Sequence, residues 1–385
     1  MTLEWPVAPG AMLGVLGGGQ LGRMFVHAAQ RMGYRCAVLD PDAASPAGAV
    51  AEVHLRAAYD DADALAQLAR QAQAITTEFE NVPAQTLRTL AASRPVAPGA
   101  DAVAVCQDRA REKAHFERCG VPCATYAVLQ SEADLGRVPA ALLPGILKGC
   151  TLGYDGKGQR SVHDAAQLRQ AWRELGAVRC VLEQRLVLER EISVVLARGR
   201  DGTIVQYAPL QNLHRDGILA VTRWPAADVP AATQAQAVQA AAAIAESLAY
   251  VGVLCVEFFV LADGRLMANE MAPRPHNSGH CTIDAADCSQ FELQVRTLAG
   301  LPLVPPRAHS AALMLNLLGD LWGDGGAAPP WHEVLALPGV HLHLYGKQQA
   351  RPGRKMGHLS VTAASADAAL RVAGEAARRL RLPLP

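Results

Sequence analysis

A glycine-rich segment with one lysine is the first feature of this sequence that could do chemistry. It follows an apolar run that ends at Lys148 and combines three glycines with a cation and polar side chains. Glycines let backbone N–H groups approach an anion and leave a loop free to close over a ligand. The segment predicts a phosphate-binding lid, although its Asp-Gly and Lys-Gly dipeptides also suit an ordinary surface turn. Its residues are Gly153, Tyr154, Asp155, Gly156, Lys157, Gly158 and Gln159.

Two glutamates about a hundred residues later could hold a metal ion together. Residues 251–270 are two apolar, β-prone runs joined by Asp263-Gly264, a favoured two-residue hairpin turn. Counting outward from that turn places Glu257 opposite Glu270. Like charges at that separation repel, so the pair predicts a divalent cation, and oxygen ligands without nearby Cys or His suit Mg²⁺. The alternative is that one glutamate points to solvent or pairs with a basic residue.

Length, charge and cysteine content exclude several classes of protein. The chain has 385 residues, half of them apolar, which is enough for two or three domains. Its 36 basic and 36 acidic residues cancel, so there is no global electrostatic case for a nucleic-acid or anionic-membrane partner. The nine cysteines contain no Cys-x-x-Cys pair and indicate reduced thiols. With no signal-like or membrane-spanning segment, we expect a cytoplasmic protein.

The first hundred residues predict a βαβ unit. A buried strand over residues 12–16 runs into a glycine-rich turn and an amphipathic helix. Gly17, Gly19 and Gly22 fit Gly-x-Gly-x-x-Gly, and Asp40 lies near the place where a dinucleotide-binding fold has its ribose-binding acid. Such a turn can receive any phosphate or merely let strand and helix pack closely, so a nicotinamide-dependent dehydrogenase remains an alternative.

The other expected elements frame these motifs. Polar residues follow a strand at 74–77, where ligands of open α/β sheets bind. The tail after about residue 305 reads as short strands and turns with a basic loop. The remaining expected elements are one helix over 101–119, strands over 141–148 and 180–184, a hairpin over 192–207 and a helix over 231–250.

Together these motifs resemble an ATP-grasp enzyme. The glycine lid after a Lys-ended strand, the Glu-Gln pair before Glu191, and Glu257 with Asn269-Glu270 carry this resemblance. Within that superfamily, five runs resemble the 5-(carboxyamino)imidazole ribonucleotide synthase family, which carries out an ATP-dependent carboxylation in de novo purine synthesis. The runs are LGGGQLGRM (16–24), the lid (153–159), NLHRDGI (212–218), APRPHNSGH (272–280) and RPGRK (351–355).

The resemblance implies a fold that is α/β and α+β. It is an ATP-grasp fold with an N-terminal Rossmann-like (pre-ATP-grasp) α/β domain over residues 1–110. The ATP-grasp domain would span 111–305, with a lid subdomain over about 112–186, and a small C-terminal β-rich domain would span 306–385. The implied ligands are ATP, Mg²⁺ (two ions with the nucleotide), bicarbonate as co-substrate and aminoimidazole ribonucleotide. The implied assembly is a homodimer.

The resemblance also assigns residues to ATP and to the metal. The lid, with Arg109 and Lys148, would contact the phosphates, and Glu257 and Glu270 would hold Mg²⁺. The adenine pocket, the ribose hydroxyls and the remaining nucleotide contacts would involve Glu183, Gln184, Leu186, Glu191, His214, Asn269 and Glu270.

The ribonucleotide would lie between the first domain and the later motifs. A nucleotide monophosphate suits a fork-shaped cation, which Arg351 and Arg354 offer. Arg274 would stabilise anionic oxygens, and His276 and Asn277 would orient the amine or the leaving phosphate. The implied catalytic residues are Arg274, His276, Asn277 and Lys355, and the implied substrate-binding residues are Gln20, Leu21, Glu78, Asp155, Arg274, Ser278, Lys347, Arg351, Arg354 and Lys355.

Two positions depart from the pattern. Many ATP-grasp enzymes carry Asn two residues after the second metal carboxylate, where this chain has Ala272. Metal ligation must therefore rest more on the two glutamates and on phosphate oxygens. Gly149 and Cys150 follow Lys148, where this family tends to have basic residues, which could weaken phosphate contacts at the start of the lid.

Three other functions remain open at this stage. A related ATP-grasp enzyme could activate formate or another carboxylate, and a non-catalytic nucleotide sensor would keep the ATP residues without turnover. A dehydrogenase would leave the lid and the carboxylate hairpin unexplained. His341 and His343 share a strand face, but two imidazoles without a third ligand favour a satisfied pair over a metal site.

Overall fold

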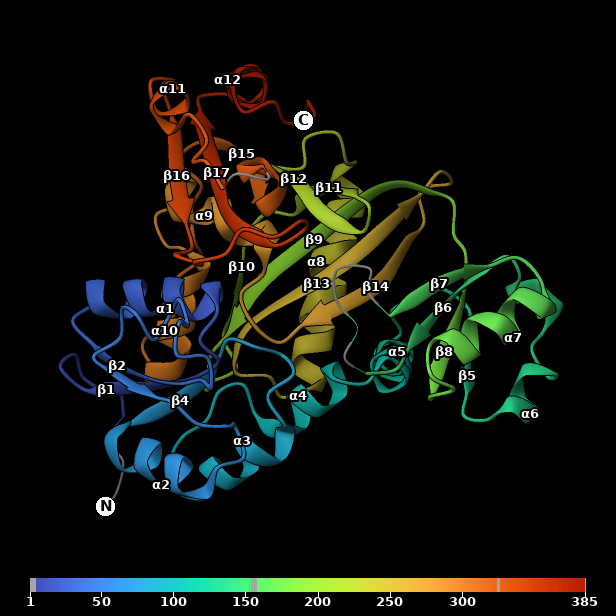
Figure 1. Cartoon of the computed structure of the whole chain (residues 1–385), viewed down its shortest axis with the longest axis horizontal. Helices are drawn as coiled ribbons and strands as arrows, with labels where there is room; N and C mark the ends of the chain where they lie inside the picture. Colours follow the sequence, from blue (N-terminus) through green and yellow to red (C-terminus); the bar gives the residue numbers. More distant parts are fainter. Residues whose placement is uncertain (1–4, 152, 154–157, 324–325, 385) are drawn as a thin grey trace.

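The computed structural model describes residues 5–151, 153, 158–323 and 326–384, and three β-sheets organise this part of the chain (Figure 1). A parallel sheet in the order β3-β2-β1-β4 forms the N-terminal part. Parallel neighbours need crossover connections, so helices alternate with the strands and bury both faces. This confirms the expected βαβ opening. Its elements are β1 (Met12–Leu16), α1 (Gln20–Arg31), β2 (Arg35–Leu39), β3 (Val53–Leu55), α2 (Ala62–Gln71), β4 (Ala74–Thr77) and α3 (Ala84–Ala91).

A second, antiparallel sheet lies on the far side of the molecule from the N-terminal sheet (Figure 1, right). Its order is β5-β8-β6-β7, and the predicted lid lies between β6 and β7. Leu147 and Leu182 pack with Trp172 in a small separate core. The elements are β5 (Tyr126–Leu129), α6 (Glu132–Leu135), η1 (Ala140–Leu142), β6 (Gly145–Gly149), β7 (Gln159–Val162), α7 (Ala165–Glu174) and β8 (Cys180–Gln184).

The third sheet joins the middle of the chain to its C-terminal part. Eight of its strands follow the order β14-β13-β9-β11-β12-β15-β17-β16, and β10 pairs with β9. The strands expected as a separate C-terminal domain therefore extend the central sheet; the domain boundaries stay a prediction. The strands are β9 (Leu188–Arg198), β10 (Ile204–Gln206), β11 (Leu210–Arg215), β12 (Ile218–Trp224), β13 (Gly252–Leu261), β14 (Leu266–Ala272), β15 (Ala311–Leu318), β16 (Val340–Leu344) and β17 (Lys355–Ala363).

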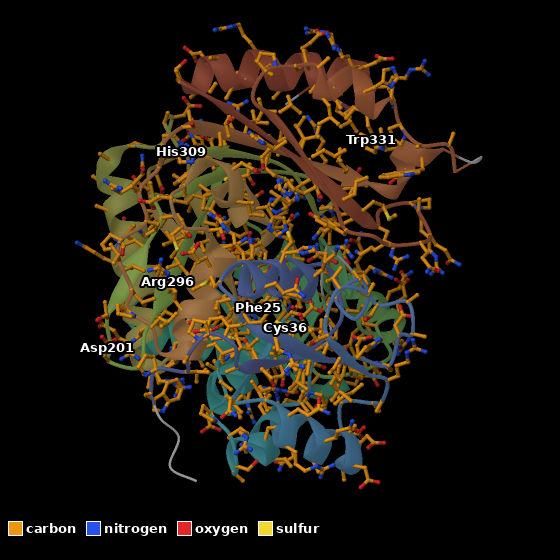
Figure 2. All side chains as sticks on the ribbon, turned by 90° about the vertical axis from the view of Figure 1, so that its left-hand side faces the viewer. Phe25, Cys36, Asp201, Arg296, His309 and Trp331 are labelled. Atoms are coloured by element: carbon orange, nitrogen blue, oxygen red, sulfur yellow. The ribbon has the colours of Figure 1, made fainter. Side chains whose placement is uncertain are left out.

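Helices cover this sheet and tie it to the N-terminal part. Helix α10 (Gln290–Ala299) packs against α1, and its Phe291 and Val295 share a core with Phe25 and Leu13 (Figure 1). Figure 2 shows Phe25 and Cys36 in this interior, where both are fully buried. The other helices after β9 are α8 (Ala231–Ser247), η2 (Asn277–Cys281), α9 (Thr282–Ala285), η3 (Gly319–Trp322), α11 (Trp331–Leu335) and α12 (Ala366–Arg379). Among the described helices, none has both the length and the apolar character needed to cross a membrane.

Two expected elements are divided in the structure. The helix expected over 101–119 is α4 (Ala100–Cys106) followed by α5 (Arg109–Arg118). The break occurs because the Asp108 side chain accepts hydrogen bonds from the backbone of Ala110 and Arg111 and caps a new helix. The strand expected over 141–148 begins only at Gly145, after a 3₁₀ turn and Pro144, which has no N–H to donate.

The hairpin with the two glutamates has the predicted pair but not the predicted turn. Its loop holds three residues, 262–264, and ends at Gly264 with φ +83°. Near the turn, the pairing of the two strands is therefore shifted by one residue from the predicted register. A β-bulge leaves Asn269 unpaired and shifts the register back, so that Glu257 does lie opposite Glu270.

Candidate active site

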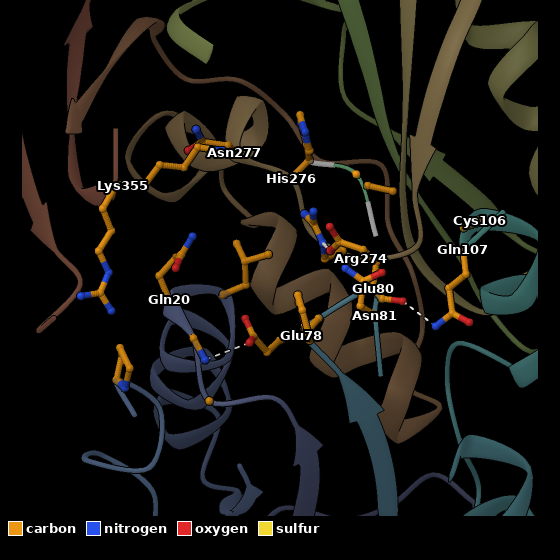
Figure 3. Close-up of a pocket in the computed structure, with 18 of the residues that line it drawn as sticks. Gln20, Glu78, Glu80, Asn81, Cys106, Gln107, Arg274, His276, Asn277 and Lys355 are labelled. Carbon is orange, nitrogen blue, oxygen red and sulfur yellow. Dashed lines mark hydrogen bonds and ion pairs between the residues drawn. The ribbon is translucent and has the colours of Figure 1, made fainter. Parts of the chain in front are cut away.

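A cavity of about 810 Å³ opens where the N-terminal sheet, the central sheet and the loop after β16 meet (Figure 3). Gln20, Glu78, Arg274, His276, Asn277 and Lys355 surround it in the close-up. The predicted site residues that line it are Gln20, Leu21, Glu78, Arg109, Gly153, Glu257, Glu270, Arg274, His276, Asn277, Lys347, Arg351, Arg354 and Lys355. The cavity thus brings together residues from three separate parts of the sequence.

Other predicted residues lie elsewhere. Tyr154, Asp155, Gly156 and Lys157 fall outside the described residues. Of the described residues predicted for the site, those that do not line this cavity are Lys148, Gly158, Gln159, Glu183, Gln184, Leu186, Glu191, His214, Asn269 and Ser278. Most of them lie on β6, β8, β9, β11 and β14, and their assignment to ATP stays a prediction.

The glycine-rich turn after β1 binds carboxylates of the chain itself. The backbone N–H of Gly19 donates to Glu78 Oε1 at 2.8 Å, and that of Gly22 donates to Glu78 Oε2 at 3.1 Å. Gly18 N donates to Asp40 Oδ2 at 2.7 Å, and Tyr59 donates to the same oxygen. The donors and the acid that a dinucleotide would use are therefore already engaged, which removes the structural support for a dehydrogenase.

The two hairpin glutamates have different environments. Glu270 Oε2 lies 2.9 Å from Arg109 Nη1, whereas the buried Oε1 of Glu257 has no hydrogen-bond partner and lies 3.7 Å from His276 Nε2. Burial and then the Glu270 charge raise the pKa of Glu257. Burial also opposes ionisation of Glu270, but Arg109 outweighs it and lowers the pKa of that carboxyl. His214 and Lys355 offset this rise only in part, so Glu257 is the carboxylate whose charge is less well compensated.

The donor atoms in this part of the cavity fit Mg²⁺. Among the described residues, no cluster of three His, Cys, Asp or Glu side chains could hold a metal without further ligands. Mg²⁺ does not need such a cage, because it commonly takes one or two carboxylates together with substrate phosphates and water. The unpartnered oxygen of Glu257 beside Glu270 supplies that kind of site.

Beside the lid, one carboxylate lies between two lysines. Glu183 Oε2 is 3.1 Å from Lys148 Nζ, and Glu183 Oε1 is 3.4 Å from the nitrogen of Lys113, which is almost fully buried. Burial opposes the ionisation of Glu183, but Lys148 and Lys113 outweigh it and lower its pKa. Nearby, His214 Nδ1 lies 2.8 Å from Glu191 Oε2. Lys113 lies on α5 and was not predicted as a site residue, because its contact with Glu183 depends on how α5 packs against β8.

Arg274 is held against the cavity wall by Glu80. The two side chains form an ion pair, and Arg274 also donates to the carbonyl of Pro275 at 3.1 Å. Gln107 holds the Glu80 loop by donating to the carbonyls of Glu80 and Val82 at 2.7 and 2.6 Å (Figure 3). Glu80 was missed as a site residue; the signal available was its place in a polar run after β4.

His276 and Asn277 begin the short helix η2. Gln290 holds the backbone of His276 from both sides, since its Oε1 accepts from the N–H at 2.9 Å and its Nε2 donates to the carbonyl at 2.8 Å. Burial first, and then Arg274 and Lys355, lower the pKa of His276 to about 3. Both amide atoms of Asn277 are buried without partners at the cavity edge. Ser278 is fully buried beneath His276.

The basic loop on the opposite side is ordered by its own backbone. Lys347 donates to the carbonyl of Lys355 at 2.7 Å, and Arg354 donates to that of Gln349 at 2.8 Å. The loop is anchored by a 2.7 Å hydrogen bond from Gly353 N to Asp320. These contacts hold several cationic side chains along one wall of the cavity.

The histidines of β16 contact a carboxylate instead of forming part of the cavity. His343 Nε2 lies 2.8 Å from Asp284 Oδ2, and His341 Nδ1 lies 3.7 Å from Asp284 Oδ1. His343 also stacks on His358 with ring centroids 4.5 Å apart. The pair therefore bridges β16 and α9.

Comparison with known protein families gives three matches along the chain. Residues 11–107 match the ribonucleotide synthetase preATP-grasp domain, residues 114–291 the ATP-grasp domain, and residues 312–372 the phosphoribosylaminoimidazole carboxylase C-terminal domain. The N5-carboxyaminoimidazole ribonucleotide synthases of Brucella melitensis and Pseudomonas aeruginosa are 44% and 43% identical to the chain. Each alignment covers 91% of this chain, and the alignments cover 96% and 94% of those two proteins.

Solved structures give the same result. An ADP complex of N5-carboxyaminoimidazole ribonucleotide synthetase is 37% identical, with a TM-score of 0.91 over 99% of this chain and 98% of that one. The Aspergillus clavatus N5-carboxyaminoimidazole synthase in complex with ADP and 5-aminoimidazole ribonucleotide is 30% identical, with a TM-score of 0.88 over 98% of this chain and all of that one. The expected ATP-grasp architecture is confirmed, and the chain belongs to the N5-carboxyaminoimidazole ribonucleotide synthase family of ATP-grasp ligases in purine biosynthesis.

Proposed function

We propose that this chain uses ATP and bicarbonate to carboxylate the 5-amino group of aminoimidazole ribonucleotide in the cavity described above. The observation that carries the proposal is the convergence of three groups on one cavity. These are the unequal carboxylates at Glu257 and Glu270, the cluster at Arg274 and His276, and the cationic loop that ends at Lys355. Nucleotide phosphates, an anionic intermediate and a ribonucleotide phosphate each need one of these environments.

In this proposal the ribonucleotide phosphate binds the basic loop. Arg351, Arg354 and Lys347 line that wall, and guanidinium groups match the oxygens of a phosphate in a fork geometry. Helix α1 provides the opposite wall through Gln20 and Leu21. The amino group of the substrate would then point toward the carboxylate pair in the middle of the cavity.

ATP would bind between the second sheet and the central sheet, with Lys148 and the lid at its phosphates. Glu257 and Glu270 would hold Mg²⁺ against those phosphates, and the ion would neutralise charge on the transferring phosphoryl group. Arg109 lies within contact of Glu270 and also donates to the carbonyl of Gly153 at 3.4 Å. It therefore links the carboxylate pair to the start of the lid.

The chemistry proceeds in two steps. A bicarbonate oxygen attacks the γ-phosphorus of ATP, the bond to the β-phosphate oxygen breaks, and ADP and carboxyphosphate form. The amine then takes the carboxyl group, directly or as released CO₂, and inorganic phosphate leaves with its bonding electrons while the amine loses a proton. Arg274, Asn277 and Lys355 would bind the anionic oxygens of carboxyphosphate. Lid closure would protect this labile intermediate from water.

A coupled assay of ADP release tests the proposal. Release is expected only when aminoimidazole ribonucleotide and bicarbonate are both present, with one ADP for each carboxylated product. Formate in place of bicarbonate is the matched control for the related carboxylate-activating enzymes. ADP release with formate, or turnover that does not need the ribonucleotide, would contradict the proposal.

The proposal includes a homodimer in the cytoplasm. All nine cysteines are unpaired in the structure, six of them buried, which suits a reducing compartment. Sedimentation equilibrium across a range of protein concentrations would test the dimer. A species with the mass of one chain at every concentration would exclude it.

A further inference from the structure

A row of buried polar side chains crosses the central sheet and ends at His276. Thr222 on β12, Asn212 on β11 and Ser193 on β9 lie in neighbouring strands and are 0%, 6% and 0% exposed. Thr222 donates to Asn212 Oδ1 at 3.1 Å, and Asn212 Nδ2 donates to Ser193 Oγ at 3.0 Å. The backbone ladders of the sheet do not need these bonds, and a buried polar group is costly unless it is satisfied.

The row continues out of the sheet into η2. Ser193 Oγ donates to Ser278 Oγ at 2.8 Å, and Ser278 Oγ lies 2.9 Å from His276 Nδ1. The backbone N–H of Ser278 also points at His276 Nδ1, at 3.4 Å. Three strands of the sheet are thus connected to the imidazole through two serine hydroxyls.

The direction of these hydrogen bonds decides what the imidazole can do. Asn212 uses an amide N–H toward Ser193, so the Ser193 proton is available to Ser278 and the Ser278 proton to His276. The backbone N–H of Ser278 is a donor that cannot reverse. Both donors converge on Nδ1, which must therefore be the acceptor nitrogen of a neutral ring.

The other ring nitrogen faces the cavity. His276 Nε2 lies 3.7 Å from Glu257 Oε1, and His276 lines the cavity beside Arg274 (Figure 3). Gln290 fixes the backbone of the same residue at its N–H and its carbonyl, so the ring has little freedom to turn away. If Nδ1 accepts, the proton of the neutral imidazole is on Nε2.

We propose that Asn212, Ser193 and Ser278 are positioning residues that hold His276 as the Nε2–H tautomer, so that it donates a hydrogen bond to an anionic oxygen in the cavity. The identity of that oxygen rests on the proposed function: it belongs to carboxyphosphate or to the phosphate that leaves. Nε2 then has no lone pair for the substrate amine, so His276 is a hydrogen-bond donor and not the general base.

Nitrogen NMR of the full chain labelled with ¹⁵N-histidine tests the tautomer without requiring turnover. The His276 signals are assigned by their loss in His276→Asn. We expect an unprotonated Nδ1 and a protonated Nε2 in the parent. In Ser278→Ala and Ser193→Ala, the signals should move toward a mixture of both tautomers. A protonated Nδ1 in the parent would overturn the proposal, and this reading holds even if the carboxylation assay fails.

Kinetics supply the second readout, with Ser360→Ala as the matched control. Ser360 is a fully buried serine of the same sheet, and its hydroxyl has no hydrogen-bond partner. We expect kcat to fall roughly tenfold in Ser278→Ala, which removes the hydroxyl at His276 Nδ1, and roughly threefold in Ser193→Ala, which only frees that hydroxyl to turn, with KM for ATP unchanged. The control should keep the parent value. If Ser278→Ala does not fold, Ser193→Ala decides, since its side chain does not reach the cavity. Kinetics and NMR signals in Ser193→Ala that match those of Ser360→Ala would overturn the proposal.

Discussion

Glu257 and Glu270 face each other across β13 and β14, but only Glu270 is paired with an arginine. In the absence of a metal, the charge of Glu257 is therefore opposed both by burial and by its neighbour. A cation bound between them would remove that conflict. The pair is thus arranged to be stable as one carboxylate and one neutral acid until the metal and the nucleotide bind.

The first prediction separates the two glutamates by substitution. Glu257→Gln should raise the thermal stability of the metal-free protein, because a neutral amide avoids the free-energy cost of burying an acid with a raised pKa and breaks no ion pair with an arginine. Glu270→Gln also relieves the repulsion but leaves Arg109 without its carboxylate, so its stability should fall below that of Glu257→Gln. Both variants should lose Mg²⁺-dependent ADP formation. Thermal unfolding and the ADP assay measure the two effects, and full activity in either variant would refute the metal assignment.

The second prediction is a pH dependence with a definite sign. Because the folded-state pKa of Glu257 lies above its ordinary value of 4.5, the folded protein binds more protons than the unfolded chain in that window. The contribution of Glu257 to stability should therefore increase as the pH falls from the raised pKa toward 4.5. The difference in unfolding free energy between the parent and Glu257→Gln, measured without metal, should shrink as the pH is lowered. A difference that stays constant with pH would show that Glu257 is ionised throughout.

The third prediction separates the two ends of the site. Arg354→Ala should weaken use of the ribonucleotide by about 1 to 3 kcal/mol, with ATP binding nearly unchanged. Lys148→Ala should do the reverse, and it should also lower stability, since Glu183 loses the nearer of the two lysines that contact it among the described residues. Steady-state kinetics with each substrate varied in turn give both values. Equal losses for both ligands in both variants would rule out this division.

The fourth prediction concerns the lid. Gly158 has φ +74°, so alanine there is strained, and alanine at Gly156 as well would restrict closure. The double variant should keep nucleotide binding and lose turnover, and its residual ADP release should be poorly coupled to carboxylated product. Measuring ADP and product in one reaction tests this. Unchanged turnover with one ADP per product would mean that the segment is a passive turn.

The glutamate pair illustrates how far the sequence could lead. The hairpin, its two strands and the opposition of Glu257 and Glu270 were predicted correctly. The turn was wrong, because a three-residue loop and a bulge at Asn269 produce two register shifts that cancel. A bulge has no reliable sequence signal here, so the correct pair resulted from two compensating errors in the predicted backbone.

Contacts between distant segments could not be predicted. Arg109 and Arg274 were expected near ligands, but their partners Glu270 and Glu80 lie 161 and 194 residues away in the sequence. The row of buried polar side chains that leads to His276 could not be predicted from the sequence for a different reason. Ser193 and Thr222 each have an apolar residue before them and give no local signal of a partner, and their side chains form one row only once β9, β11 and β12 are side by side.

The most direct test of the central claim is the fate of oxygen from ¹⁸O-labelled bicarbonate. If a bicarbonate oxygen attacks the γ-phosphorus, the inorganic phosphate released with the carboxylated ribonucleotide should carry one labelled oxygen per turnover. The label should depend on the presence of aminoimidazole ribonucleotide. Unlabelled phosphate formed together with carboxylated product would contradict the account.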